Sequence, residues 1–222
     1  MAERLVHPDS QNQSGGLVWE AFRRGKVWIT RGQDGALFEF AAGALAQVKG
    51  DASRLKNSPK EHALVLGAMA LHPCLAWADA LVAVPNGMIE DAEQIAERLG
   101  KPVVRMYRPE NATPRYDIRF VSNRIDRTLA AKIVTICALE DLSSTGSTPY
   151  EQAKILRHTN PSLIIHSLSM LQRAPIRPEY QQGPDAVGYH TLCVPEQSIP
   201  LNLDEFVAAF GFEPELVGAD YS

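Results

Sequence analysis

Through the middle of the chain, short apolar runs alternate with segments whose apolar residues recur at helical spacing. The pattern predicts strands at 80–84, 102–107, 118–122, 132–139 and from 163, and helices at 60–71, at 88–99 and from the loop after residue 140 to about 157. Pro73 and Gly100 are expected to end the first two helices. Strands that alternate with helices indicate βαβ units. We therefore expect an α/β fold in which helices flank a mainly parallel, twisted sheet, with ligands at the carboxyl ends of its strands.

The segment before this alternation, from Leu17 to about Phe40, is rich in aromatic residues and glycine. Its runs at 27–30 and 37–40 flank turn residues and predict a short hairpin. We expect one domain over residues 17–222 after a polar tail at 1–16. Its parts are an N-terminal hood at about 17–45, a core at about 58–172 and a C-terminal extension at 173–222.

The composition is that of an ordinary globular protein. Of 222 residues, 45% are apolar and 22% are charged. The net charge of -4 argues against a nucleic-acid-binding protein, because phosphate backbones select for a basic surface. A local pocket for a small anion is still compatible with this charge. No apolar run is long enough to span a bilayer, and the polar start resembles neither a signal peptide nor an anchor. We therefore expect no association with a membrane.

The cysteines and histidines predict no metal site. Cys74, Cys137 and Cys193 are too far apart in the sequence for a metal or redox motif, and they fit a reduced, cytoplasmic setting. Cys137 lies within an apolar run and is expected to be a small buried residue. The six histidines show no ligand spacing, so surface or core positions are the better interpretation.

The most informative segment is Glu140–Thr148, which follows the most regular strand prediction and precedes a helix. Backbone amides at a helix N-terminus lack intrahelical partners and carry partial positive charge, so they bind phosphate. Gly146 permits the close approach of an anion and an unusual backbone dihedral. Hydroxyl donors of the same loop are Ser144, Thr145, Ser147 and Thr148.

Two adjacent carboxylates, Glu140 and Asp141, stand at the start of this segment. Carboxylates accept hydrogen bonds from vicinal sugar hydroxyls, so acids followed by phosphate donors predict a site for a ribose 5-phosphate. The alternative is that Asp141 and Ser144 only form a turn, with Thr145 or Ser147 as a helix cap. The segment is not a Walker A loop, because the G-x-x-x-x-G-K pattern is missing.

The whole segment resembles the motif with which type I phosphoribosyltransferases bind 5-phosphoribosyl 1-diphosphate (PRPP). In that motif, apolar residues precede two acids and a Thr-Gly-Ser/Thr phosphate loop. The resemblance implies that Glu140 and Asp141 hold the ribose hydroxyls, that Asp141 takes part in catalysis, and that residues 144–148 surround the 5-phosphate. The PRPP-binding set that it implies is Glu140, Asp141, Ser143, Ser144, Thr145, Gly146, Ser147 and Thr148.

Within this family the chain looks most like the orotate phosphoribosyltransferases, over roughly residues 17–173. Residues 25–38 are similar to their hood hairpin, 82–87 to their diphosphate-loop strand, and 103–110 to the strand that leads into their mobile loop. The diphosphate loop that this implies comprises Pro85, Asn86, Gly87, Arg105 and Arg108, and the loop cations Arg108 and Arg115 would act in catalysis under a lid at 109–116. The implied base pocket comprises Thr30, Arg31, Phe38 and Arg173.

The chain departs from the family pattern where lysines are usual. Thr30 replaces the lysine of the hood, Asn86 that of the diphosphate loop, and Pro109 the first lysine of the mobile loop. Arg115 is the nearest cation in that loop, and arginine is a good bidentate phosphate ligand.

Two hypotheses of different class follow. The first is a Mg²⁺-dependent phosphoribosyltransferase that joins PRPP to orotate or a related base, with a purine as a weaker option. The second is a module on the same fold that binds PRPP or a nucleotide without turnover. The missing lysines favour the module, whereas the acid pair and the hood favour the enzyme. The resemblance also implies a homodimer.

Overall fold

The computed structural model describes residues 16–31, 38–39, 45–46, 48–50, 52–84, 87–104, 106–107, 119–120, 132–172, 175–194 and 197–198. Within these ranges, no helix combines the length and the apolar character needed to cross a membrane.

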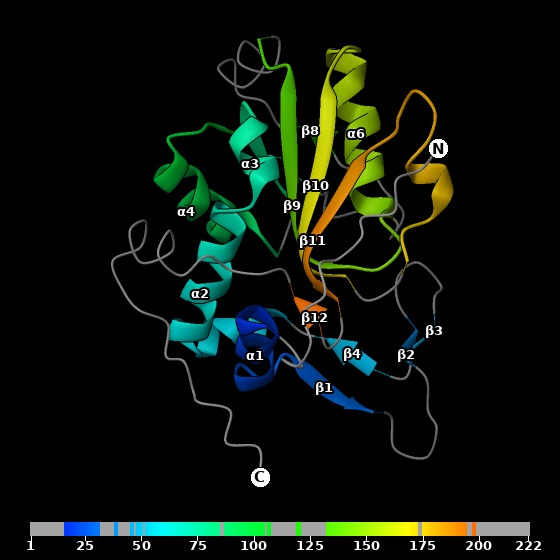
Figure 1. The fold of residues 1–222 in the computed structure, drawn as a ribbon. Helices are drawn as coiled ribbons and strands as arrows, with labels where there is room; N and C mark the ends of the chain where they lie inside the picture. Colours follow the sequence, from blue (N-terminus) through cyan, green and yellow to red (C-terminus); the bar gives the residue numbers. More distant parts are fainter. Residues whose placement is uncertain are drawn as a thin grey trace.

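Among the described residues, the fold is built around a six-stranded sheet in the order β12-β11-β10-β9-β5-β6 (Figure 1). Its strands are β5 (Ala80–Ala83), β6 (Val103–Val104), β9 (Thr135–Ser143), β10 (Ile164–Gln172), β11 (Gly188–Val194) and β12 (Gln197–Ser198). The strands from β11 to β6 are all parallel, and β12 pairs antiparallel with β11. The predicted mainly parallel sheet is therefore confirmed.

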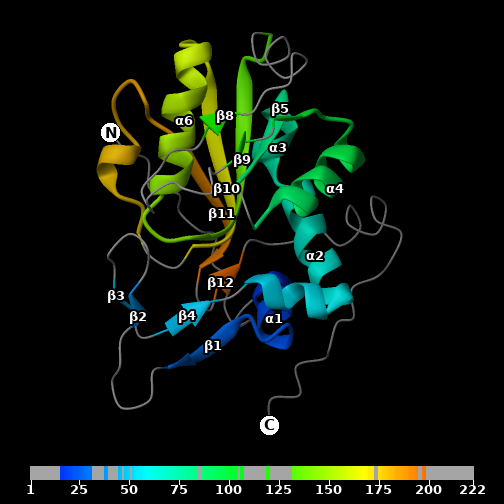
Figure 2. The ribbon, with the colours of Figure 1, turned by 180° about the vertical axis from the view of Figure 1, so that it is seen from behind.

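Helices cover both faces of this sheet, as Figures 1 and 2 show from opposite sides. One face carries α1 (Leu17–Arg24), α2 (Pro59–Ala70), α3 (Pro73–Trp77) and α4 (Ile89–Leu99), and the other carries α6 (Ser147–Thr159). Short 3-10 helices follow at η2 (Ala52–Asn57) and η3 (Pro178–Tyr180). Successive strand residues point to opposite faces. In β9, Leu139 therefore packs in the core beneath α2 and α4, whereas Ala138 packs beneath α6.

The direction in which the chain builds the sheet reverses between β5 and β9. From β5 it passes through α4 to β6, and from β9 it passes through α6 to β10, which lies on the opposite side. Such a reversal places ligands outside the carboxyl ends of the two strands. The pairing of β5 with β9 ends at Ala83 and Leu139, whereas β9 continues to pair with β10 as far as Ser143. Residues 140–143 therefore extend beyond the end of β5.

The predicted hairpin between 27–30 and 37–40 is wrong in its pairing. β1 (Trp28–Arg31) pairs antiparallel with β4 (Val48–Gly50), and β2 (Phe38–Glu39) pairs with β3 (Leu45–Ala46). Turn residues indicate where a chain reverses direction, but packing decides which two strands pair with each other. Both pairs lie at the end of the sheet where its parallel strands end (Figures 1 and 2).

The strand predicted at 102–107 is divided between two sheets. β6 joins the central sheet, whereas β7 (Met106–Tyr107) pairs antiparallel with β8 (Arg119–Phe120). β8 falls within the strand predicted at 118–122. A continuous apolar run indicates extended backbone, but it does not show where the chain leaves one sheet for another.

The helix ends were predicted well, because they depend on neighbouring residues in the sequence. α2 and α4 match the predicted helices to within one residue at each end. Gly100 ends α4 in the left-handed conformation, with φ of 62°. Pro73 does more than stop α2, because it is also the first residue of α3, a position where proline needs no amide hydrogen.

Several elements were not predicted from the sequence, and two of them, α1 and β11, are important for the core and for the site. α1 buries Val18, Ala21 and Phe22 in the main core, at helical spacing that the aromatic and glycine-rich text obscured. β11 was missed because no helical pattern separates it from β10. Its Tyr-His-Thr-Leu-Cys-Val text, from Tyr189 onward, has high strand propensity.

An exposed carboxylate joins the start of β9 to the start of β5. Oδ2 of Asp79 accepts hydrogen bonds from the backbone amides of Thr135 at 2.8 Å and Val134 at 3.0 Å. These two bonds, with a smaller contribution from the charge of Lys101, lower the pKa of Asp79 below its ordinary value of 3.8.

We expect Asp79→Asn to lower the free energy of unfolding at neutral pH. In acid, the difference in this free energy between the variant and the wild type should become smaller. The lowered folded-state pKa means that the carboxylate stabilises the fold above an unfolded pKa of about 3.8, and that this contribution is lost as the pH falls through the lower folded value. Urea unfolding across this pH range measures the effect, with Glu97→Gln, an exposed carboxylate on α4, as the control. A gap that stays constant down to strong acid would contradict this assignment.

Candidate functional site

β9 extends further than the sequence indicates. The strand was predicted at 132–139 with a loop from Glu140, but it begins at Thr135 and runs to Ser143. Pairing with β10 holds the backbone extended through the polar residues. Glu140 and Asp141 are therefore strand residues, and their direction is set by the sheet rather than by a loop.

The alternation of a strand sends the two acids to opposite faces. Glu140 is buried on the face covered by α6, and its negative charge contributes to raising the pKa of the Tyr189 hydroxyl. Asp141 is half-buried on the other face, and its Oδ1 accepts a hydrogen bond of 2.7 Å from the amide of Leu142.

Asp141 lies against the turn that follows β5. A methyl group placed on Gly87 would lie 3.1 Å from Oδ2 of Asp141 and 3.4 Å from its Cγ. This separation is tighter than ordinary van der Waals contact, so the missing side chain of Gly87 lets the turn approach the carboxylate. Gly87 of the turn after β5 and Asp141 of β9 therefore meet at one edge of the sheet.

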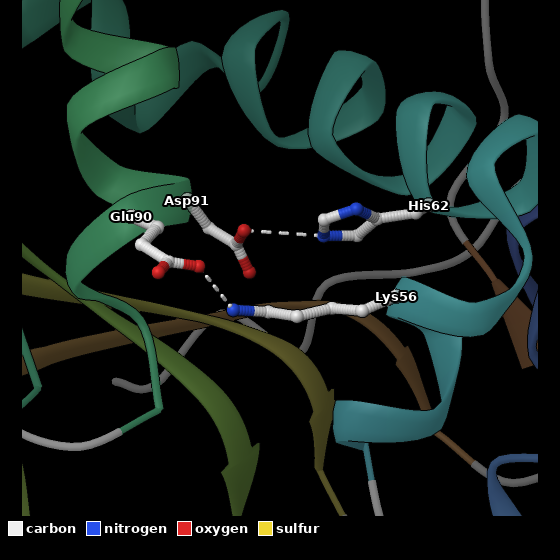
Figure 3. Close-up of polar contacts among 4 residues, drawn as sticks. All are labelled: Lys56, His62, Glu90 and Asp91. Carbon is white, nitrogen blue, oxygen red and sulfur yellow. Dashed lines mark hydrogen bonds and ion pairs between the residues drawn. The ribbon is translucent and has the colours of Figure 1, made fainter.

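The helix after this turn is fastened at its first residues, as Figure 3 shows. Oε2 of Glu90 lies 2.8 Å from Nζ of Lys56, and this hydrogen bond raises the pKa of Lys56. Oδ1 of the buried Asp91 lies 3.2 Å from Nε2 of His62 on α2. The second pair is within ion-pair distance, although its angles do not make a hydrogen bond. Together the pairs tie the start of α4, and with it Gly87, to α2 and η2.

The predicted phosphate loop turns tightly into α6. Gly146 caps the helix with φ of 81° and ψ of 10°, a left-handed conformation that glycine adopts without strain. The Thr145 hydroxyl donates to Oγ of Ser147 at 3.4 Å. Pro149 is the third residue of α6 and has no amide hydrogen, so the amide donors of this helix end precede it.

The other hydroxyls predicted for this loop lie around the same turn. Ser144 stands in the bend before Gly146, and Thr148 stands in the first turn of α6, both half-buried. The Ser143 hydroxyl is buried and, within the described part of the chain, has no hydrogen-bond partner. Such a group is suited to a polar ligand, because an unsatisfied buried hydroxyl is unfavourable.

Residues that follow β10 in the chain form hydrogen bonds and side-chain contacts with this loop. The Tyr189 hydroxyl donates to the carbonyl oxygen of Gly146 at 2.6 Å, and the Arg177 amide donates to that of Thr145 at 3.1 Å. A methyl group on Gly146 would lie 2.8 Å from Cε1 of Tyr189 and 3.0 Å from Cγ2 of Ile176. None of these three supporting residues was foreseen, because only the strand propensity around Tyr189 distinguishes them in the sequence.

The remaining predicted site residues fall where the structure gives no side chain. Outside the described residues lie Pro85, Asn86, Arg105, Arg108, Arg115 and Arg173. Thr30 and Arg31 lie in β1 and Phe38 lies in β2, and only their backbone is described. The diphosphate and base pockets, apart from Gly87, therefore stay predictions.

A second polar cluster lies near the amino ends of the strands, away from this edge. Nδ1 of His166 lies 3.1 Å from Nε2 of His190, and the ring centroids of His72 and His190 are 5.5 Å apart. Burial, with smaller contributions from the two neighbouring histidines, lowers the pKa of His190 to about 4. Sγ of Cys74 lies 3.9 Å from Sγ of Cys137, which is buried as predicted. Among the described residues, no group of three or more His, Cys, Asp or Glu side chains is placed to hold a metal ion.

Solved structures with a similar fold include phosphoribosyltransferases. The orotate phosphoribosyltransferase from Aeropyrum pernix matches 88% of this chain and 98% of its own, with a TM-score of 0.60 and 15% identity. The UMP synthase of Leishmania donovani matches 88% of this chain over 37% of its own, with a TM-score of 0.56 and 16% identity. An adenine phosphoribosyltransferase matches 78% of this chain and 99% of its own, with a TM-score of 0.52 and 11% identity.

No protein-family model matches the sequence, and no curated protein sequence matches it. At these identities the structural likeness shows the fold. The chain has the type I phosphoribosyltransferase fold, and orotate phosphoribosyltransferases are among the structures that it resembles. The predicted fold is thereby confirmed.

We expect Gly146→Ala to be more destabilising than Gly183→Ala, although the two glycines share nearly the same backbone angle, with φ of 81° and 82°. A side chain in this conformation costs about 1–2 kcal/mol at either position. At Gly183 nothing lies within 4 Å of the added methyl, whereas at Gly146 it would overlap the Tyr189 ring. Urea unfolding should show an additional loss of about 1 kcal/mol or more for Gly146→Ala. Equal losses of stability in the two variants would mean that the Tyr189 ring moves aside at no cost and would contradict this prediction.

Proposed function

We propose that this protein is a PRPP-dependent phosphoribosyltransferase that transfers ribose 5-phosphate to a nitrogenous base and releases diphosphate. The observation that carries the proposal is the contact between Gly87 and Asp141. This contact brings the turn after β5 to Asp141, near the point where β9 leads into a helix N-terminus suited to phosphate. This arrangement supports the proposal that the ribose, the 5-phosphate and the diphosphate of PRPP would all bind at this edge of the sheet.

The ligand would lie across this edge with its ribose between its two charged groups. The 5-phosphate would take amides of the Ser144–Thr148 loop, where the helix end supplies partial positive charge. Asp141 and Glu140 would accept hydrogen bonds from the ribose hydroxyls, and carboxylates are strong acceptors for them. The diphosphate would lie over Gly87 and the neighbouring Pro85 and Asn86.

The reaction requires stabilisation of a leaving anion. The bond between C1 of the ribose and the diphosphate oxygen breaks, positive charge develops on the sugar ring, and a ring nitrogen of the base forms the new bond to C1. Cations fixed near the departing diphosphate lower the barrier most effectively when water is excluded. We assign this role to Arg105, Arg108 and Arg115, with residues 109–116 as the lid.

Mg²⁺ suits the donors available here. The ion prefers oxygen ligands, keeps several waters, and binds through one or two carboxylates with substrate phosphates rather than in an all-protein cage. Asp141, and Glu140 from the other face of β9, would be the candidate carboxylates for such an ion. When bound, the ion would neutralise charge on the diphosphate.

The acceptor we propose is orotate or a related base, in a pocket formed by Thr30, Arg31, Phe38 and Arg173. The likeness to orotate phosphoribosyltransferases supports this choice, although an adenine phosphoribosyltransferase shares the same fold. We further propose a cytoplasmic homodimer, as the family resemblance implies.

The second candidate is a PRPP- or nucleotide-binding module without turnover. The observation that favours it is the replacement of the family's lysines by Thr30, Asn86 and Pro109. Diphosphate release on addition of a base separates the two candidates. PRPP binding without release on orotate or any purine would favour the module.

We expect the double variant Glu140→Gln with Asp141→Asn to weaken PRPP binding at least about a hundredfold. The two amides keep the shape of the acids but remove their charge, and a hydrogen bond to a charged group contributes about 1.5–3 kcal/mol. Isothermal calorimetry of PRPP with Mg²⁺ measures the affinity, and Glu97→Gln on α4 is the control. Unchanged affinity in the double variant would remove the ribose role from both acids.

A further inference from the structure

The backbone of the proposed phosphate loop is held through two of its carbonyl groups by residues that follow β10. The carbonyl oxygen of Thr145 accepts from the Arg177 amide at 3.1 Å, and that of Gly146 accepts from the Tyr189 hydroxyl at 2.6 Å. Both donors come from residues that follow β10, far along the chain from the loop itself. Two consecutive peptide groups are therefore held by the C-terminal part of the protein, and the Gly146 carbonyl also accepts the first hydrogen bond of α6, from the Tyr150 amide at 3.4 Å.

Peptide geometry converts these two contacts into a direction for the amides. A trans peptide is planar, so the carbonyl oxygen of one residue and the amide hydrogen of the next point in opposite directions. Fixing the Thr145 carbonyl towards Arg177 turns the Gly146 amide to the opposite side. The hydrogen bond from Tyr189 to the Gly146 carbonyl likewise turns the Ser147 amide to the side opposite Tyr189. The Gly146 amide then points away from residue 177, and the Ser147 amide points away from the Tyr189 hydroxyl.

Tyr189 is well suited to hold this orientation. Its ring packs directly on Gly146, because a methyl group added to Gly146 would lie only 2.9 Å from Cζ of Tyr189. Burial, with a smaller contribution from the negative charge of Glu140, raises the pKa of its hydroxyl. The hydroxyl therefore stays protonated at neutral pH and acts as a donor to the carbonyl. The same side chain thus lies against the proposed phosphate loop and on the face of the sheet to which Glu140 points.

We propose that Tyr189 is a positioning residue for the 5-phosphate, which together with the amide of residue 177 aims the amides of Gly146 and Ser147 at the ligand. The inference rests on the proposed function, because it names what holds the phosphate half of that site. Tyr189 does not itself touch the ligand, since its hydroxyl is engaged on the far side of the loop.

The first test is Tyr189→Phe, which keeps the ring and removes only the hydroxyl. Calorimetry with PRPP and with ribose 5-phosphate, each with Mg²⁺, should show Kd raised about three- to tenfold, as expected for the loss of one neutral hydrogen bond, with unchanged stoichiometry. A purely structural defect would instead lower the fraction of competent protein and leave Kd unchanged. The matched control is Tyr180→Phe, because Tyr180 stacks on Tyr150 with centroids 4.6 Å apart and phenylalanine keeps that contact.

The second test addresses the other donor without touching a core side chain. Residue 177 has φ of -66°, which proline adopts, so Arg177→Pro removes the amide hydrogen at a compatible backbone position. Arg177→Ala keeps the amide and removes the same exposed side chain. We expect Arg177→Pro, but not Arg177→Ala, to raise Kd for both ligands.

The outcomes separate this inference from the proposed function. If the wild type binds PRPP and ribose 5-phosphate but Tyr189→Phe and Arg177→Pro keep the wild-type Kd, the positioning role is overturned and the proposed function stands. A loss of stoichiometry at unchanged Kd, or an equal rise in Tyr180→Phe, also overturns it. If the wild type binds neither ligand, both the proposed function and the inference fall.

Discussion

The candidate site depends on β9 extending further along the sheet than its neighbour β5. β9 pairs with β5 only as far as Leu139, yet it stays extended against β10 as far as Ser143. The acids therefore stand on a rigid strand at a place where β5 has already turned away at Gly87. If the two strands ended together, Asp141 would be covered by a neighbouring strand. If β9 ended at Leu139, both acids would lie on a loop without a fixed direction.

The sheet also separates two kinds of charge that would otherwise oppose each other. A phosphate and a carboxylate repel, so a sugar phosphate site needs its acids and its anion-binding amides close together but not superposed. The amides belong to the turn at Gly146, and the acids belong to the preceding strand. Alternation along β9 then sends Asp141 towards Gly87 and Glu140 towards Tyr189.

The sequence predicts the features of this site that arise from neighbouring residues. Glycine and hydroxyls between an apolar run and a helical segment mark a phosphate loop, because the strand end, the turn and the helix start are all local. The end of β9 was placed too early, since polarity alone suggested a loop at Glu140, whereas pairing with β10 keeps that residue in the strand. The pairing of β1 with β4, the division of 102–107 between two sheets and the packing of Tyr189 on Gly146 escape prediction for the same reason. Each joins residues that only the folded chain brings together.

The contact of Tyr189 with Gly146 shows why a local motif is an incomplete description of a phosphate site. Amides at a helix start bind an anion only if the peptide planes face it, and a glycine such as Gly146 gives those planes more freedom than any other residue, although the hydrogen bond from the Tyr150 amide already restrains the plane after it. Hydrogen bonds to the carbonyls of Thr145 and Gly146 remove that freedom before any ligand arrives. Preorganisation of this kind lowers the entropy lost on binding. The C-terminal segment, which resembles the family least in sequence, is therefore the part that fixes the geometry of the segment that resembles it most.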